Sequence, residues 1–255
     1  MAKQLNLANR TKELDIFLKM ATGNYDCRIM LIEGESGMGK TSLLKRFKHK
    51  CPSEIKYIPF DCKGVVSIPA FLSQIVVDLG HDKFPSFVSK VKVFVQGGVD
   101  FSENDIAAEN TISIAINSSN VDPATQNFRL EQLQQAFFND LAKLEQRIVI
   151  TLDTYQMVNE TLQNWIESKW LRAVERQLDN VVTVIAGQFV PDHQNNSVWG
   201  DECEHFVLSA IKVKDWCEFC RDLPEDTVKG LALAGNGHPA NVHQMLSLVV
   251  KRWSV

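Results

Sequence analysis

One stretch in the first quarter of the chain has residue types and a spacing suited to holding a chain of phosphates. Residues 34–41, with the sequence GESGMGKT, fit the phosphate-binding pattern GxxxxGK[ST]. Glycines let the backbone turn its N–H groups inward around phosphate oxygens, and a helix beginning at Lys40 would add the positive end of its dipole. Lys40 would neutralise the β- and γ-phosphates, and the Thr41 hydroxyl would bind Mg²⁺. The alternative is a glycine-rich strand-to-helix turn with a chance lysine.

The sequence on either side of this loop supports the phosphate-binding interpretation. Residues 28–33 form an apolar run typical of a buried strand, and residues 40–47 have the pattern of an amphipathic helix. A strand, a glycine-rich loop and a helix are the context that the motif requires. The residues of this segment that we expect to contact a nucleotide are Gly34, Glu35, Ser36, Gly37, Met38, Gly39, Lys40, Thr41 and Ser42.

Two later strands end in polar residues that complete a candidate nucleotide site. Residues 148–152 are an apolar β-run that ends in Asp153, which would hold Mg²⁺ directly or through water. Another apolar run, residues 181–187, ends in Gln188. Ligands of open α/β sheets bind at the carboxyl ends of the strands, so Gln188 would lie beside a γ-phosphate. We therefore expect Lys40, Asp153 and Gln188 to be the catalytic group, with Thr41 and Asp153 as metal ligands; the alternative for Asp153 is a turn residue.

Strand and helix patterns alternate along the rest of the chain, which predicts an α/β fold. Residues 56–61 read as a second strand, with Pro59 favouring an edge position, and residues 205–208 as a short fifth strand. Helical patterns cover residues 14–21, 68–79, 128–146 and 159–177, and then residues 213–223, 224–234 and 239–253. Residues 81–127 follow a looser pattern, and we interpret them as an insertion. Within it, the alternation over residues 111–116 predicts a short strand or hairpin.

Composition excludes several classes of protein. The chain has 255 residues, 45% of them hydrophobic, and a net charge of −4. This balance gives no general attraction to nucleic acid or to anionic membranes, so neither is an expected partner. No stretch reaches the ~18 apolar residues of a membrane span, and no signal segment is present, so we expect a cytoplasmic protein. Its six cysteines are expected to be reduced thiols that pack in the fold.

These motifs resemble the nucleotide-binding core of the signal-transduction ATPases with numerous domains, the STAND class, which are close relatives of the AAA+ ATPases. Four places carry the resemblance: residues 9–14 resemble the segment before the core, residues 34–41 the Walker A loop, residues 148–153 the Walker B strand, and residues 237–239 the GxP motif. The resemblance covers nearly the whole chain except residues 81–127.

The resemblance implies a P-loop NTPase fold, a three-layer αβα sandwich with a parallel sheet of strand order 5-1-4-3-2, followed by a small all-helical lid domain. Residues 1–210 would form the nucleotide-binding domain and residues 211–255 the lid. The backbone at Asn9 and Arg10 would meet the adenine of ATP or ADP, Pro239 would also contact the base, and Mg²⁺ would accompany the nucleotide. Sensor or effector domains on the same chain or on partner proteins are also implied, and oligomerisation on ATP binding remains open.

The chain departs from the family pattern in ways that bear on catalysis. Thr154 and Tyr155 follow Asp153 where family members often place an acidic residue, so the expected carboxylate general base is missing. Residues 189–203 contain no Arg or Lys, although ring-forming relatives usually carry a trans-acting arginine there. We therefore expect a regulatory ATPase that hydrolyses ATP slowly as a conformational switch. The alternative is a nucleotide-dependent binding or scaffold module with little or no turnover.

Overall fold

The computed structural model describes residues 9–64, 67–95, 108–117 and 122–253. Its centre is a parallel five-stranded sheet. The strands are β1 (Ile29–Glu33), β2 (Lys56–Asp61), β3 (Ile148–Asp153), β4 (Val181–Gly187) and β5 (Cys203–Val207). They lie in the order β2-β3-β4-β1-β5, which confirms the expected order 5-1-4-3-2 read from the other edge. The expected edge position of the strand containing Pro59 is also confirmed.

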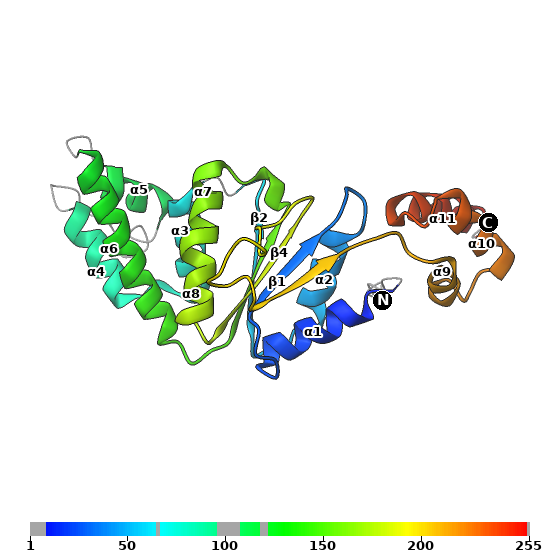
Figure 1. Cartoon of the computed structure of the whole chain (residues 1–255), viewed down its shortest axis with the longest axis horizontal. Helices are drawn as coiled ribbons and strands as arrows, with labels where there is room; N and C mark the ends of the chain where they lie inside the picture. Colours follow the sequence, from blue (N-terminus) through cyan, green and yellow to red (C-terminus); the bar gives the residue numbers. More distant parts are fainter. Residues whose placement is uncertain (1–8, 65–66, 96–107, 118–121, 254–255) are drawn as a thin grey trace.

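Helices cover both faces of the sheet, which gives the three layers expected (Figure 1). Helices α1 (Thr11–Thr22) and α2 (Lys40–Lys50) pack on one face, where Phe17 and Phe47 stack with ring centroids 4.1 Å apart. The opposite face is covered by α3 (Ile68–Leu79), α6 (Pro123–Ala142), α7 (Glu160–Trp165) and α8 (Leu171–Arg176). Because helices cover both faces, β4 is buried along its whole length.

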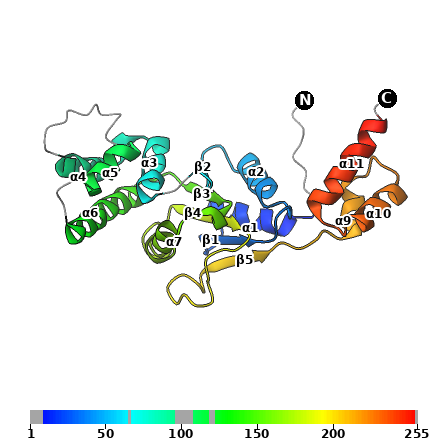
Figure 2. The same cartoon turned by 90° about the horizontal axis from the view of Figure 1, so that it is seen from above.

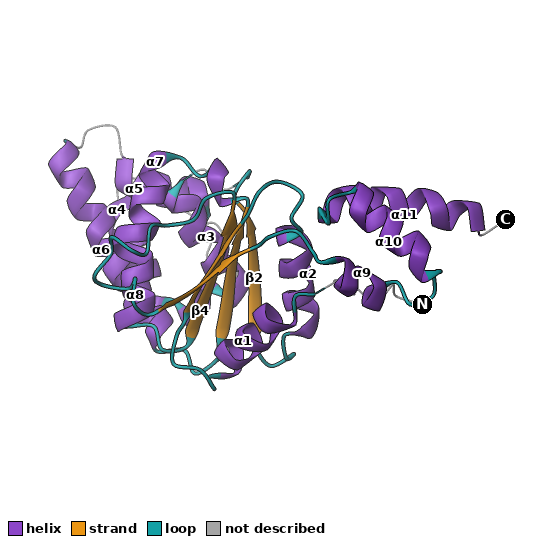
Figure 3. Ribbon diagram, turned by 45° about the vertical axis from the view of Figure 1, so that its right-hand side comes forward, coloured by secondary structure: helices purple, strands orange, loops and turns teal. Residues whose placement is uncertain are grey.

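The remaining helices lie at the two ends of the molecule (Figures 1 and 2). At one end, α4 (Pro85–Val95) and α5 (Glu109–Asn117) pack with α3 and α6. At the other end, α9 (Val213–Phe219), α10 (Glu225–Ala234) and α11 (Pro239–Trp253) surround a separate apolar cluster that includes Trp216 and Val242. Figure 3 shows this helical group beside the edge of the sheet at which the β-strands end. None of the described helices is long and apolar enough to cross a membrane.

The prediction of a strand or hairpin at residues 111–116 is wrong, because these residues lie in α5. The buried residues of this segment follow helical spacing: they are Thr111, Ile112, Ala115 and Ile116. The alternation of a strand would instead have placed Ile112, Ile114 and Ile116 on one face. Packing of α5 against α3, α4 and α6 thus outweighs the β-propensity of isoleucine and threonine. Residues 96–107 and 118–121, which also belong to the expected insertion, lie outside the described residues.

Several helix boundaries also differ from the prediction. The helix expected at residues 128–146 begins five residues earlier, at Pro123, because the Asp122 carboxylate accepts hydrogen bonds from the amides of Ala124 and Thr125. The helix expected at residues 159–177 contains a π-helical segment, Ile166–Trp170, between α7 and α8. There the buried Trp170 indole donates to the Thr183 hydroxyl of β4 at 3.1 Å.

The six cysteines are all free thiols, as expected.

The assignment of α5 can be tested with two isoleucines two positions apart. Ile112→Ala should lower the free energy of unfolding by about 2–5 kcal/mol, because a fully buried side chain is replaced by a cavity. Ile114 is 46% exposed, so Ile114→Ala should cost less than about 1 kcal/mol. Urea unfolding followed by circular dichroism gives both values. Equal costs at the two positions would contradict the helix and favour a strand.

Candidate functional site

The loop at residues 34–41 has the backbone geometry needed to surround a phosphate chain. It connects the end of β1 to the start of α2, which begins at Lys40. Gly37 has a φ of 82° and Gly39 a φ of 90°, backbone values that residues with a Cβ rarely adopt. These two residues turn the chain so that α2 starts directly over the end of the sheet. Because the first amides of a helix have no intrahelical acceptor, those of Lys40, Thr41 and Ser42 are available to an anion.

Lys40 is held inside the loop that it closes. The residue is only 9% exposed, and its Nζ donates to the carbonyl oxygens of Gly34 at 2.5 Å and Glu35 at 2.8 Å. Burial lowers the pKa of Lys40, and the negative charge of Asp153 partly opposes this shift. A phosphate group at the loop would supply the anionic partner that the buried ammonium group otherwise finds only in carbonyl dipoles.

Thr41 and Asp153 line the same cavity and offer a donor set that suits Mg²⁺. Asp153 ends β3, and one of its carboxylate oxygens accepts from the Thr154 amide at 2.8 Å, which fixes the orientation of the carboxylate. A hydroxyl and one carboxylate are oxygen ligands, and Mg²⁺ usually takes only one or two carboxylates together with waters and substrate phosphates. Among the described residues no cluster of three His, Cys, Asp or Glu side chains could hold a metal alone. The residues thus fit a magnesium ion that arrives with a nucleotide.

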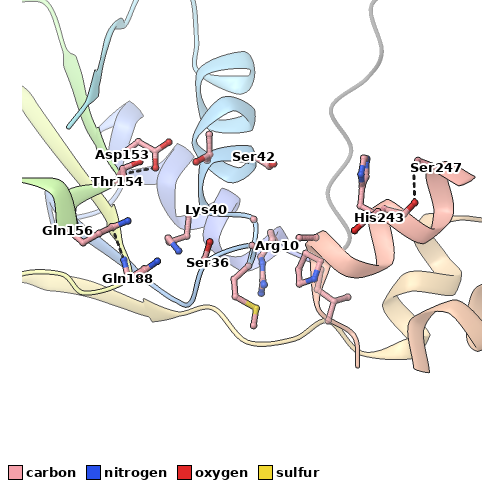
Figure 4. Close-up of a pocket in the computed structure, with 18 of the residues that line it drawn as sticks. Arg10, Ser36, Lys40, Ser42, Asp153, Thr154, Gln156, Gln188, His243 and Ser247 are labelled. Carbon is pink, nitrogen blue, oxygen red and sulfur yellow. Dashed lines mark hydrogen bonds between the residues drawn. The ribbon is translucent and has the colours of Figure 1, made fainter. Parts of the chain in front are cut away.

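Gln188 is placed where its position after β4 predicts, at the carboxyl edge of the sheet. Its backbone amide donates to the Gln156 side-chain oxygen at 3.1 Å, and both glutamines line the cavity (Figure 4). Either carboxamide could orient a water molecule by hydrogen bonding, but neither carries charge. Tyr155, two residues after Asp153, is buried and its hydroxyl bonds to Glu167, so it points away from the site.

Helix α11 forms the opposite wall of the cavity and is bonded directly to the loop. The Ala240 amide donates to the Gly37 carbonyl at 3.2 Å, and His238 Nε2 lies 3.1 Å from the Ser36 carbonyl oxygen. A Cβ at Gly37 would come within 2.4 Å of the His238 ring, so the missing side chain allows this contact. Pro239, His243 and Ser247 of α11 line the cavity, and Figure 4 shows the last two on the helix across the cavity from Lys40.

The segment before α1 is tied to the same group of helices. The Arg10 guanidinium lines the cavity and donates to the Ser209 carbonyl at 2.9 Å. Asn9 is not among the lining residues; its side chain instead donates to the Asp215 carboxylate of α9. A base contact from Asn9 would therefore have to come from its backbone, as the resemblance implies.

The cavity gathers most of the residues proposed from the sequence. Its volume is about 830 Å³, within the usual ~300–1,000 Å³ for a small-molecule site. The proposed residues that line it are Arg10, Ser36, Gly37, Met38, Gly39, Lys40, Thr41, Ser42, Asp153, Gln188 and Pro239. Three of the proposed residues, Asn9, Gly34 and Glu35, do not line it, although Gly34 and Glu35 contact Lys40 through their carbonyls.

Other lining residues were missed by the sequence reasoning. Helix α11 contributes Ala240, His243, Gln244 and Ser247, α9 contributes Trp216 and Phe219, and the turn after β2 contributes Lys63. The α11 residues follow helical spacing from Pro239, so the one-face rule applied to that helix could have found them. The sequence gives less indication that Lys63 belongs to the site, because its single relevant feature is its position two residues after a predicted strand.

Comparison with known proteins agrees with this architecture. The family model described as AAA ATPase domain matches residues 6–184. The Cdc6p structure from Pyrobaculum aerophilum has a similar fold, with a TM-score of 0.55 and 13% identity. So does a STAND protein with a tetratricopeptide repeat sensor from Pyrococcus horikoshii, with a TM-score of 0.51 and 16% identity. A search of curated proteins gives no significant match.

Coverage differs between this chain and the two structures. The alignments cover 95% and 91% of this chain but only 62% of the Cdc6p chain and 28% of the STAND chain, so it spans less than two thirds of either. At these identities the similarity concerns the fold alone. The family model, in contrast, covers more than half of the sequence and includes both the loop at residues 34–41 and the strand that ends at Asp153. The chain therefore belongs to the AAA ATPase domain family.

Proposed function

We propose that this chain binds Mg-ATP and Mg-ADP, hydrolyses ATP slowly, and uses the bound nucleotide to set the position of α9–α11. In this proposal residues 1–210 form the nucleotide-binding domain and residues 211–255 act as a lid. The observation that carries it is the shared cavity wall: the loop that would hold the phosphates is hydrogen-bonded at Ser36 and Gly37 to the start of α11. A ligand in the loop would therefore act on the lid directly.

Each side chain has a defined part in this proposal. Lys40 and the loop amides bind the phosphates, while Thr41 and Asp153 hold Mg²⁺, which would neutralise charge on the phosphate oxygens when bound. Gln188 and Gln156 orient the attacking water. Arg10 and Pro239 lie at the lid end of the cavity, beside the aromatic side chains of α9, where an apolar base would be accommodated.

The residues of the described part of the site support the proposal of slow hydrolysis. Phosphoryl transfer needs a metal, a positioned water and compensation for charge that spreads over the γ-phosphate. Asp153 is the one carboxylate among the described lining residues, and it is assigned to the metal. Without a carboxylate free to activate water, the nucleotide would remain bound long enough to hold the lid in place.

The signal that such a switch would transmit lies with other domains or partners. The structurally similar STAND protein carries a tetratricopeptide repeat sensor, and this chain spans 28% of that protein. We propose by analogy that α9–α11 communicate with a sensor or effector domain on the same or another chain. The second candidate function, a binding or scaffold module with little turnover, uses the same site residues.

Removing the loop lysine should weaken binding of both nucleotides. We expect Lys40→Ala to reduce the affinity for Mg-ATP and Mg-ADP at least ~10-fold, because a charge-assisted contact to the β-phosphate is common to both. Isothermal titration calorimetry measures both affinities. Lys45→Ala, which removes an exposed lysine from the same helix, is the matched control and should bind normally. Equal affinity in Lys40→Ala and the wild type would reject nucleotide binding at this loop.

Substitutions of the proposed metal ligands should change the Mg²⁺ dependence of ATP binding, which distinguishes them from substitutions of the residues that bind the phosphates. Thr41→Ala and Asp153→Ala should each lower the gain in ATP affinity that Mg²⁺ provides, because each removes one oxygen ligand. Titrations of ATP with Mg²⁺ and with excess chelator measure that gain. Thr41→Ser keeps the hydroxyl and serves as the control. An unchanged Mg²⁺ dependence in both alanine variants would mean that the metal is held elsewhere.

Turnover by the isolated chain should be low. We expect phosphate release well below ~1 s⁻¹, against a typical enzyme value of ~10 s⁻¹, because the described site lacks a second carboxylate. A coupled phosphate-release assay with Lys40→Ala as the background control gives the rate. Steady turnover above ~10 s⁻¹ would reject the slow switch. Release no faster than the Lys40→Ala background, with binding intact, would favour the scaffold module.

A further inference from the structure

Lys63 lies in a short turn that follows β2, next to the proposed metal ligand. Asp61, the last residue of β2, is in register with Asp153 of β3, and the amide of Cys62 donates to the Asp153 carbonyl at 3.0 Å. The turn is closed by two further bonds, from the Lys63 amide to the Asp61 carboxylate at 3.1 Å and from the Gly64 amide to the Asp61 carbonyl at 2.9 Å. The backbone of Lys63 is thus fixed one strand away from Asp153.

Lys63 lines the cavity, and among the described residues none is found to bond to its ammonium group. Three cationic residues line the cavity within the described residues, namely Arg10, Lys40 and Lys63. The Arg10 guanidinium donates to the Ser209 carbonyl, and the Lys40 ammonium donates to two loop carbonyls. Within the described part of the chain, no hydrogen bond or ion pair is found for the Lys63 ammonium. A lysine that lines a cavity without such a bond is suited to an anionic ligand.

The position of Lys63 indicates which part of the ligand it meets. Arg10 and Pro239 line the lid end of the cavity, whereas Lys63 follows the edge strand beside Asp153. In the proposed complex Thr41 and Asp153 would hold the metal that accompanies the terminal phosphates, so Lys63, which follows the strand beside Asp153, would be at the γ-phosphate end. Mg-ATP carries roughly one negative charge more than Mg-ADP, and this additional charge is on the γ-phosphate.

We infer that Lys63 binds the γ-phosphate of ATP and makes the site prefer ATP to ADP. This inference rests on the proposed function, since it assigns a specificity residue to the same nucleotide site. Lys40 would contact the β-phosphate, which both nucleotides have, in addition to the γ-phosphate, so its removal weakens the binding of both nucleotides. Lys63 meets the one group that differs. Its contact exists before as well as during phosphate transfer, so it acts on substrate affinity more than on the chemical step.

The test compares affinities for ADP and for an ATP analogue with a nitrogen bridge between the β- and γ-phosphates, in the full chain with Mg²⁺. Lys63→Met should weaken binding of the analogue ~10-fold while ADP affinity changes less than ~2-fold. Lys63→Arg should restore the preference. Lys92→Met, which removes an exposed lysine from the distant α4, should change neither affinity. In the hydrolysis assay Lys63→Met should raise KM with little change in kcat.

The outcomes separate this inference from the proposed function. If Lys63→Met binds both nucleotides like the wild type, or weakens both equally, Lys63 does not read the γ-phosphate and the inference is overturned. The proposed site still stands in that case, provided that Lys40→Ala weakens both nucleotides. A folded wild-type chain that binds neither nucleotide rejects both the proposed function and the inference.

Discussion

The site depends on one backbone constraint, the turn that carries the chain from the end of β1 into the first turn of α2. Gly37 and Gly39 adopt positive φ values there, and this geometry directs the first amides of α2 toward the cavity. The turn has a fixed position because β1 is an interior strand, paired with β4 on one side and β5 on the other. The same parallel pairing brings the ends of β3 and β4, and therefore Asp153 and Gln188, to the edge of the sheet beside the loop.

The loop has two faces with opposite hydrogen-bonding character, and this links the phosphate site to the lid. The amides of Lys40, Thr41 and Ser42 are available to an anion, whereas that of Met38 donates to the Glu35 carbonyl at 3.3 Å. The carbonyl groups of Ser36 and Gly37 are directed to His238 and Ala240 at the start of α11. Amide and carbonyl of neighbouring residues belong to the same planar peptide unit, so they cannot rotate independently. Any reorientation of the loop amides around phosphates changes the direction of the carbonyls. In the proposed function, the two hydrogen bonds to α11 would therefore couple phosphate binding to lid position without an intermediate element.

Sequence alone predicts those features that depend on short contiguous patterns. The loop, the strand ending at Asp153, the edge strand with Pro59 and the start of α11 at Pro239 were all placed correctly, because each has its signal within a few residues. Helix α5 was assigned to the wrong type because β-branched residues at alternate positions favour a strand until packing with other helices is considered. Lys63, Trp216 and His243 were missed since only the folded chain brings them to the cavity. Local signals thus define the phosphate end of the site, and long-range packing defines the remainder.

In the proposed function, the charges around the cavity favour a long-lived ATP state over rapid turnover. A cation accelerates the reaction only when it binds the transition state more tightly than the substrate. An arginine supplied by a neighbouring protein does so, because it contacts charge that develops during phosphate transfer. Lys40 is already held in the loop, and Lys63 extends from a turn fixed to β3, so both would contact phosphate oxygens that are charged before the reaction. Such contacts stabilise substrate and transition state alike, which tightens binding and leaves the barrier unchanged. Because residues 189–203 contain no Arg or Lys, acceleration would need a cation from outside this segment, and a partner that supplies one would control how long the lid remains bound.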